Sequence, residues 1–298
     1  MSGVVHSASA FLSSEAQRII SIAVVAGCFG LMVMAETLAP LRRTVESKLR
    51  RVVRNLTTGG VSLAILTLLQ TPILIPASRW AEAHHVGLLN WVQWPAAVEI
   101  FVAVVLLDYT LWFWHRANHT VAFLWRFHLV HHIDLDLDAS TALRFHFGEL
   151  TLSIAYRVVQ ILVIGASSFS VWMWQTILFA SILFHHSNLR LPIGLERRLI
   201  RLVVTPRMHG IHHSTCLNET SSNWSSVLSC WDYLHRTMLL DVPQHDVTIG
   251  VPAYRDPQEV TIGRILLLPF MPQRADWLLP NGDVSVRPHD GPHEELAE

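Results

Sequence analysis

Long apolar runs separated by short polar stretches dominate the chain. The first covers residues 19–40 and is interrupted only by Glu36 near its end. Because a helix needs about 20 apolar residues to cross the hydrocarbon core of a bilayer, this run predicts a membrane-spanning helix. Runs of similar character cover residues 56–76 and 95–114, and the segment 77–94 between them contains three tryptophans. Tryptophan is enriched where a membrane meets water, so we interpret this segment as interfacial.

Two shorter apolar runs, at residues 150–164 and 171–184, flank the sequence Gly165-Ala166-Ser167-Ser168. Two helices joined by so short a polar linker predict a hairpin that enters and leaves on one side of the membrane. From residue 272 the chain is rich in Pro, Gly and charged residues, which is typical of a mobile tail. The pattern as a whole predicts an all-α integral-membrane helical bundle.

The distribution of basic residues predicts how this bundle is oriented. A cluster follows the first apolar run and consists of Arg42, Arg43, Lys48, Arg50, Arg51 and Arg54. Basic residues beside membrane spans stay on the cytoplasmic side, so we expect a multi-pass protein whose histidine-rich segments face the cytoplasm. We divide the chain into transmembrane and interfacial residues 1–94, a histidine-rich domain at 95–240 and a C-terminal cytoplasmic tail at 241–298.

Composition supports a membrane protein and excludes some classes of partner. Of 298 residues, 51% are hydrophobic and only 15% are charged. The formal net charge of -1 offers no broad positive field for nucleic acid. The three cysteines are far apart and form no C-x-x-C motif, so neither a disulfide framework nor a thiolate metal site is indicated.

Histidine is the unusual residue of this chain, with 18 copies. Eight of them fall into H-x-x-x-H or H-x-x-H-H arrays, in which spacings of three and four residues place the rings on one face of a helix. These are His115 and His119, then His128, His131 and His132, and finally His209, His212 and His213. Eight imidazoles exceed the roughly four ligands that one ion takes, so the arrays predict a cap that holds two metal ions.

Ligand type alone leaves the metal open, because neutral imidazole binds Zn, Cu, Fe and Ni. The zinc-protease motif H-E-x-x-H is absent from the sequence. His146 and His185 lie near the arrays in sequence, and for each the choice between direct ligand and supporting residue stays open.

Charged residues near the arrays are candidates for catalytic roles. Asp108 precedes His115 by seven residues, and we expect its carboxylate to accept the free N–H of a ligand histidine. Arg144 and Glu149 are candidates for a catalytic or stabilising ion pair. We expect the alternating acids at residues 134–138 to lie in a solvated loop.

The histidine-rich region resembles the fatty acid hydroxylase and sterol desaturase superfamily of membrane oxygenases. The resemblance covers about residues 108–237. It is carried by the W-x-W-H-R-x-x-H sequence ending at His119 and by the segments 125–132, 141–146, 184–192 and 205–213. Two departures are Phe147, where the family usually has proline, and His235-Arg236 in place of Phe-Gly.

The resemblance implies a di-iron enzyme in which the eight arrayed histidines, together with His186, hold two Fe ions. It implies activation of O2 as co-substrate and oxidation of an unactivated C–H bond of a lipid, by hydroxylation or desaturation. The chain has no G-x-G-x-x-G dinucleotide fingerprint, so the electrons are expected from a separate redox partner such as a ferredoxin or reductase.

The alternative is a non-catalytic or hydrolytic zinc-binding membrane protein. A transporter places ionisable ligands near the middle of the bilayer, whereas these histidines collect outside the apolar runs. Hydrolytic zinc chemistry uses a general base, and no glutamate stands beside the ligands in sequence.

Overall fold

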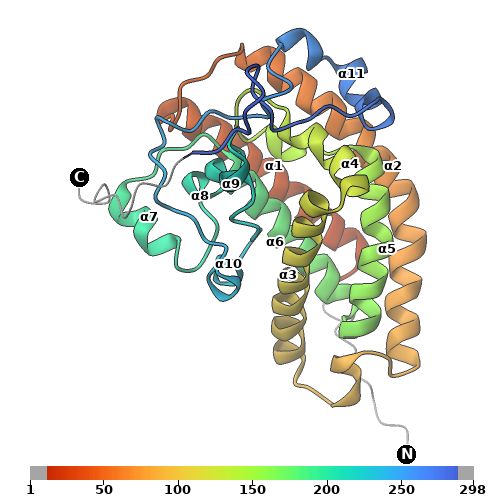
Figure 1. Ribbon diagram of the computed structural model, residues 1–298. Helices are drawn as coiled ribbons and strands as arrows, with labels where there is room; N and C mark the ends of the chain where they lie inside the picture. The colour runs from red at the N-terminus through yellow and green to blue at the C-terminus, as the bar shows by residue number, and fades with distance from the viewer. Residues whose placement is uncertain (1–11, 288–298) are drawn as a thin grey trace, which may run out of the picture.

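The computed structural model describes residues 12–287, and the regular secondary structure in that range is helical (Figure 1). Loops and isolated β-bridges join the helices, and the described part contains no β-strand. The predicted all-α fold class is therefore confirmed. The architecture has two parts, a bundle of long helices and a cap of short ones.

Five long helices form the bundle. They are α1 (Ser14–Leu38), α2 (Lys48–Ala83), α3 (Ala96–Thr120), α5 (Phe147–Ile164) and α6 (Ser168–His186). Helix α2 packs on α5, while α6 packs on both α1 and α3. Within the described residues, α1, α3, α5 and the segment that begins with α2 are long and apolar enough to cross a membrane.

Helix α2 is longer than the apolar pattern predicts. It continues through Pro72 and Pro76 to Ala83, and only the short 3-10 helix η2 (Leu88–Trp91) interrupts the loop before α3. The first part of the segment interpreted as interfacial is therefore helical. Proline removes one backbone hydrogen bond, but helices in membrane bundles tolerate this loss because neighbouring groups satisfy the freed carbonyl.

The predicted hairpin of α5 and α6 is present. Helix α5 ends at Gly165, whose φ of 76° lies in the left-handed region, and the hydroxyl of Ser167 caps α6 by accepting from Ser170 N. A Cβ atom at Gly165 would lie 3.0 Å from the Val86 carbonyl oxygen. Glycine is therefore required both by the backbone angle and by the close approach of the loop after α2.

The cap gathers at one end and along one side of the bundle (Figure 1). It contains α4 (Ala122–His132), η3 (Thr141–Leu143), α7 (Ile193–Leu199), α8 (Pro206–His212), α9 (Leu217–Thr220), α10 (Cys230–His235), η4 (Pro257–Glu259), α11 (Ile262–Leu267) and η5 (Leu268–Phe270). Helix α4 packs against α3 and α5, and α8 packs against α6. These contacts bring the histidine-bearing ends of the long helices under the short ones.

The C-terminal segment is part of the cap. Val251, Tyr254 and Ile265 are buried in one cluster with Leu129 and Val130 of α4. Further along, Ser285 N donates to the Trp277 carbonyl at 2.8 Å, and Arg287 forms an ion pair with Glu219. The prediction of a mobile tail is therefore wrong for residues 272–287, because long-range contacts that composition does not reveal fix this segment in place.

Candidate metal centre

Nine histidines meet where the cap covers the bundle. Helix α3 contributes two, α4 three, α6 one and α8 with its C-cap residue three; they are His115, His119, His128, His131, His132, His186, His209, His212 and His213. Local sequence explains why α8 forms where it does. Pro206 occupies its first turn, and the Thr205 hydroxyl caps it by accepting from Met208 N.

The nine rings form two groups. The first contains His115, His119, His128, His132 and His212, and the second contains His131, His186, His209 and His213. Within each group one nitrogen from every ring lies within 4.8 Å of the others. The structure thus brings all nine predicted ligands together in two sets.

Helical spacing explains the division. His128 and His132 are four residues apart and share the first group, while His131 between them faces the second. On α8 the arrangement is reversed, since His209 and its i+4 neighbour His213 share the second group. Side chains at i and i+4 point the same way, so each H-x-x-H-H motif sends two rings to one group and one to the other.

The second group has the geometry of a shared ligand site. The Nε2 atom of His186 lies 2.9 Å from that of His131 and 3.0 Å from that of His209. The Nε2 atom of His209 also lies 3.0 Å from that of His213. A single ring nitrogen cannot satisfy two facing nitrogens by donation and acceptance at once. Nitrogens about 2.1 Å from one ion at right angles to each other are about 3.0 Å apart, so these residues fit a metal ion.

The first group carries unpartnered nitrogens. The Nε2 atoms of His119, His128, His132 and His212 are buried and have no hydrogen-bond partner among the described residues. A buried polar atom without a partner costs about 1–3 kcal/mol, so several together call for an explanation. A metal ion that accepts their lone pairs explains why these nitrogens have no other partner.

Hydrogen bonds on the opposite ring nitrogens set the tautomer. The Nδ1 atoms of His115, His186 and His212 face the carbonyl oxygens of Trp224, Ile182 and Ser222 at 2.7, 2.7 and 2.8 Å. A carbonyl oxygen can only accept, so Nδ1 carries the hydrogen and Nε2 keeps its lone pair. This is the tautomer that ligation through Nε2 requires.

Burial keeps five histidines of the cap neutral by lowering their pKa values. It lowers the pKa of His131, His132 and His209 well below the ordinary value of 6.5, and neighbouring imidazoles lower it further. The pKa values of His212 and His213 are lowered for the same reasons. At neutral pH these rings therefore offer lone pairs rather than positive charge.

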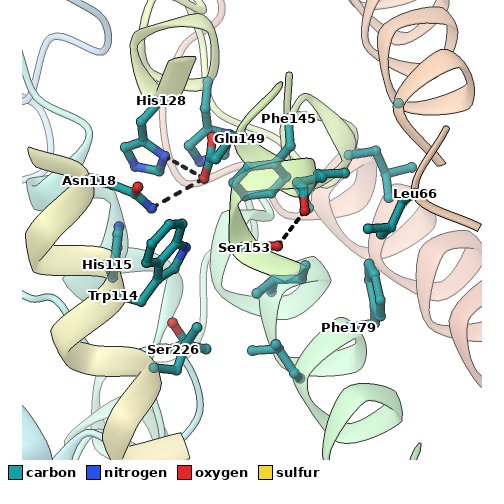
Figure 2. Close-up of a pocket in the computed structure, with 18 of the residues that line it drawn as sticks. Leu66, Trp114, His115, Asn118, His128, Phe145, Glu149, Ser153, Phe179 and Ser226 are labelled. Atoms are coloured by element: carbon teal, nitrogen blue, oxygen red, sulfur yellow. Dashed lines mark hydrogen bonds and ion pairs between the residues drawn. The ribbon is translucent and has the colours of Figure 1, made fainter. Parts of the chain in front are cut away.

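Glu149 is the carboxylate that touches a predicted ligand. Its Oε1 atom accepts from His128 Nδ1 at 3.0 Å and from Asn118 Nδ2 at 3.4 Å (Figure 2). The carboxylate orients the ring of His128 and favours a lone pair on its Nε2 atom. Glu149 thus has the role that we expected of Asp108, which is to accept the N–H of a ligand histidine.

Asp108 lies elsewhere. Its Oδ2 atom accepts from Leu228 N at 3.0 Å and from Trp231 Nε1 at 2.7 Å. Seven residues of helix amount to about 10 Å along the axis, which separates this carboxylate from the ring of His115. The expected bond to a ligand histidine is therefore wrong, and Asp108 ties α3 to the start of α10.

Arg144 does not pair with Glu149. Its Nε atom donates to the Val130 carbonyl at 2.8 Å, and its Nη1 atom lies 3.4 Å from Asp134 Oδ1. The chain between η3 and α5 is not helical, so residues 144 and 149 do not share a helix face. The predicted ion pair is wrong, and Arg144 positions the end of α4 instead.

The acids after α4 are also buried, contrary to the solvated loop we expected. Arg51 lies 3.1 Å from Asp134 Oδ2 and 2.8 Å from Asp138 Oδ2, and Arg54 lies 2.9 Å from Asp134 Oδ1. Burial raises the pKa of Asp134, but the positive charges of Arg51 and Arg144 outweigh it and hold that pKa well below its ordinary value. We call Arg51, Arg54, Arg144, Asp134, Asp136 and Asp138 the ion-pair network.

The two uncertain histidines have different surroundings. His146 caps α5, since its Nδ1 atom accepts from Gly148 N at 2.9 Å, and its Nε2 atom faces the Leu266 carbonyl. It lies outside both groups. The ring of His185 is 4.1 Å from that of His209, so it flanks the second group without joining it.

An apolar cavity of about 330 Å³ runs between α2, α3, α5 and α6. Its walls include Leu66 and Phe179, and its histidine end includes His115, His128 and His186. Figure 2 shows His128 beside Glu149 and His115 near Asn118 on one side of the cavity, with Leu66 and Phe179 on the other side. The cavity therefore connects the bundle interior to the histidine groups.

Comparison with known proteins gives a consistent picture. The family model "Fatty acid hydroxylase" matches residues 100–237. An ornithine lipid hydroxylase of Rhizobium tropici is 32% identical over 60% of this chain and 53% of its own length. An alkylglycerol monooxygenase of Danio rerio is 26% identical over 65% of this chain and 41% of its own. For a cholesterol 25-hydroxylase of Mus musculus the values are 24%, 51% and 55%.

The chain thus spans about half the length of the curated relatives it matches. No solved structure matches it. The matched segment contains all nine histidines of the two groups. The match thus relates the histidine-bearing part of the chain, residues 100–237, to the fatty acid hydroxylase family.

Proposed function

We propose that this protein is a membrane-bound di-iron oxygenase that uses O2 to hydroxylate or desaturate a C–H bond of a lipid. The observation that carries the proposal is the position of the two histidine groups at one end of an apolar cavity between membrane-length helices. Neutral rings supply metal ligands there, and the helices supply a path by which a lipid chain reaches them.

The lipid substrate is supported by the lining of the cavity and by the relatives. The three relatives are named for an ornithine lipid, an alkylglycerol and cholesterol, which share lipid character but no head group. Apolar side chains such as Leu63, Leu66 and Leu178 line the cavity and exclude water from an alkyl chain. We therefore assign the substrate as a lipid held by its hydrocarbon part.

The family and its oxygenase relatives favour iron over zinc for the nine histidines. Two bound Fe ions supply the capacity to activate O2 and oxidise an unactivated C–H bond. The chain contributes the ligand nitrogens, and Glu149 and three backbone carbonyls hold four of the rings in the required tautomer. We assign metal binding and lipid oxidation to a domain of residues 95–240, which residues 1–94 and 241–298 flank.

We further propose that the histidine groups face the cytoplasm. The loop between α1 and α2 lies against the cap, since Val45 N and Glu46 N donate to Asp136. Arg43 and Arg50 beside this loop are exposed, and exposed basic residues flanking spans favour the cytoplasmic side. A separate redox partner such as a ferredoxin or reductase then has access to the cap and delivers electrons.

The direct test is oxidation by the iron-loaded full chain in detergent. Ornithine lipid, alkylglycerol and cholesterol are each incubated with ¹⁸O2 and a reduced ferredoxin with its reductase. We expect a product from at least one lipid that carries one labelled oxygen or has lost two hydrogens. Failure of all three lipids to react with iron-loaded protein would contradict the proposal.

A matched pair of glycine variants tests the cavity. A Cβ atom at Gly60 meets nothing within 4 Å, and this glycine lines the cavity, so leucine there fills the path without a clash. We expect Gly60→Leu to keep its iron and to lose lipid oxidation at least about tenfold. Gly30→Leu, in equally open space on α1 but away from the cavity, is the control. Equal activity in both variants would place the substrate elsewhere.

A further inference from the structure

Arg157 is a cation without an anionic partner among residues 12–287. It stands on α5 and lines the same cavity as the histidines. Its Nη1 atom donates to Gln70 Oε1 of α2, which is neutral. None of the ion pairs formed within residues 12–287 includes Arg157.

The polar groups near Arg157 along the hydrogen-bond chain and along α5 are neutral. Gln70 on α2 accepts from Arg157 and donates to Gln175 on α6, while Tyr156 and Gln160 on α5 donate to Thr110 on α3. The Nε2 atom of Gln175 is buried and donates to no described acceptor. This end of the cavity therefore presents hydrogen-bond donors and one positive charge.

A lone guanidinium between membrane helices is costly, because neither lipid nor apolar side chains solvate it. Charged residues inside spans usually pair with another charge or mark the path of a ligand. Since none of the residues described by the structure pairs a carboxylate with Arg157, a ligand that brings an oxyanion is the partner that fits. Arginine is suited to this role because its planar fork matches carboxylate and phosphate geometry.

The position of Arg157 along α5 sets its distance from the metal centre. Glu149, Ser153, Arg157 and Gln160 all line the cavity from one face of α5. Eight residues of helix separate Glu149 from Arg157, which is about 12 Å along the axis. The apolar walls of the same cavity include Leu66, Leu150 and Phe179.

We propose that Arg157, assisted by the amide of Gln175, binds an oxyanion of the lipid substrate, a carboxylate or a phosphate. The alkyl chain then runs along the apolar walls toward the histidine groups. The oxidised carbon lies on the order of 12 Å from the oxyanion, well away from the head group. This inference rests on the proposed oxygenase function and adds the class of substrate.

Wild-type protein tests the inference without any substitution. Equilibrium binding to the iron-loaded full chain is measured for palmitate, hexadecyl phosphate and hexadecanol, which share one chain length. We expect at least one anionic probe to bind about tenfold or more tightly than the alcohol, because its hydrogen bonds to Arg157 are charge-assisted. The tighter of the two anions identifies the head group. Equal binding of all three probes overturns the inference.

Substitution then locates the effect. Arg157→Gln is expected to lose about tenfold in affinity for the preferred anion and to leave hexadecanol unchanged, while Arg157→Lys keeps part of the affinity. The exposed Arg201→Gln, which removes the same charge from the cap surface, is expected to bind like wild type. Anion selectivity that survives in Arg157→Gln assigns the oxyanion to another residue and overturns the inference.

Iron content is measured for each variant and separates this inference from the proposed function. Iron retained with anion affinity lost supports the role of Arg157 whether or not any lipid is oxidised. Oxidation of lipids by a wild-type protein that shows no anion preference keeps the oxygenase function and rejects the role of Arg157. If Arg157→Gln fails to fold, the three-probe comparison on wild type decides.

Discussion

Two buried polar clusters adjoin each other in the cap, and they differ in whether the chain completes them. In the ion-pair network the carboxylates of Asp134 and Asp138 lie within 3.1 Å of guanidinium nitrogens of Arg51. In the histidine cluster, most Nε2 atoms instead face other Nε2 atoms or have no partner among the described residues. In the network every charged group has an opposite charge beside it, whereas the histidines need a ligand. The contrast separates a structural cluster from a functional one.

The two clusters are also joined. Arg144 lies 3.4 Å from Asp134 Oδ1, and it donates from Nε to the carbonyl of Val130, which directly precedes His131 and His132. The network thereby fixes the end of α4 from which two of the rings project. Each of the predictions below perturbs one cluster and follows the consequence for the other.

The largest effect is expected from His209→Ala. His209 lies 3.0 Å from both His186 and His213 through Nε2, so it is the central ligand of the second group. We expect lipid oxidation to fall to background and iron content to fall by about half, because the first group keeps its own ligands. Metal analysis and product formation check this, with His245→Ala as the control since that side chain is 75% exposed. Full activity in His209→Ala would contradict the assignment.

Disrupting the ion-pair network should lower the stability of the fold without removing a metal ligand. Arg51 is fully buried between acids, and its replacement by alanine leaves carboxylates uncompensated. We expect the free energy of unfolding to fall by about 3–5 kcal/mol. The adjacent Arg50→Ala, at an exposed position, is the control and should change it by less than about 0.5 kcal/mol. Equal stability of the two variants would show that the network is not structural.

Glu149→Gln tests the carboxylate that accepts a hydrogen bond from the predicted ligand His128. The amide carries no negative charge, so it holds the Nδ1–H of His128 more weakly. We expect iron affinity or activity to fall about 10- to 100-fold, as is usual when the partner of a ligand histidine changes. Asp108→Asn is the matched control and should leave iron affinity unchanged, because Asp108 contacts Leu228 and Trp231 instead. The reverse order of effects would restore Asp108 as the orienting carboxylate.

The smallest effect per residue concerns pH in metal-free protein. The pKa of His131, among others, is lowered well below 6.5 by burial in the folded state, so near pH 6.5 the unfolded chain binds more protons. Stability must therefore fall as pH falls, by about 0.4 kcal/mol per such histidine at pH 6.5. The pKa of Asp134 is held below its ordinary 3.8, so the network contributes a constant amount in this range. Unfolding of metal-free protein between pH 7.5 and 6.5 measures the slope, and a rise in stability on acidification contradicts it.

How well a feature could be predicted from the sequence depends on how far apart its interacting residues lie along the chain. The i, i+4 spacing of His115 with His119 and of His128 with His132 is local, and the structure retains it within one group. The hairpin at Gly165 is equally local. The assignment of Asp108 was wrong because its partners lie 120 and 123 residues away and no local pattern indicates them.

The acids after α4 were also mispredicted, because their partners are distant in the sequence. Alternating aspartates are typical of a solvated loop, and nothing within the loop indicates that Arg51, 83 residues earlier, lies against Asp134. The basic cluster after the first apolar run was the only available signal, and we interpreted it as an orientation signal alone. Arg51 and Arg54 in fact contact the cap acids, and exposed Arg43 and Arg50 carry the orientation argument.

The central claim is that two iron ions complete the histidine cluster, and metal content per chain tests it most directly. The full chain is purified in detergent under reducing conditions and analysed by inductively coupled plasma mass spectrometry. The account predicts about two irons per chain. Zinc that persists after reconstitution with ferrous iron, or a metal content well below one ion per chain, would contradict it.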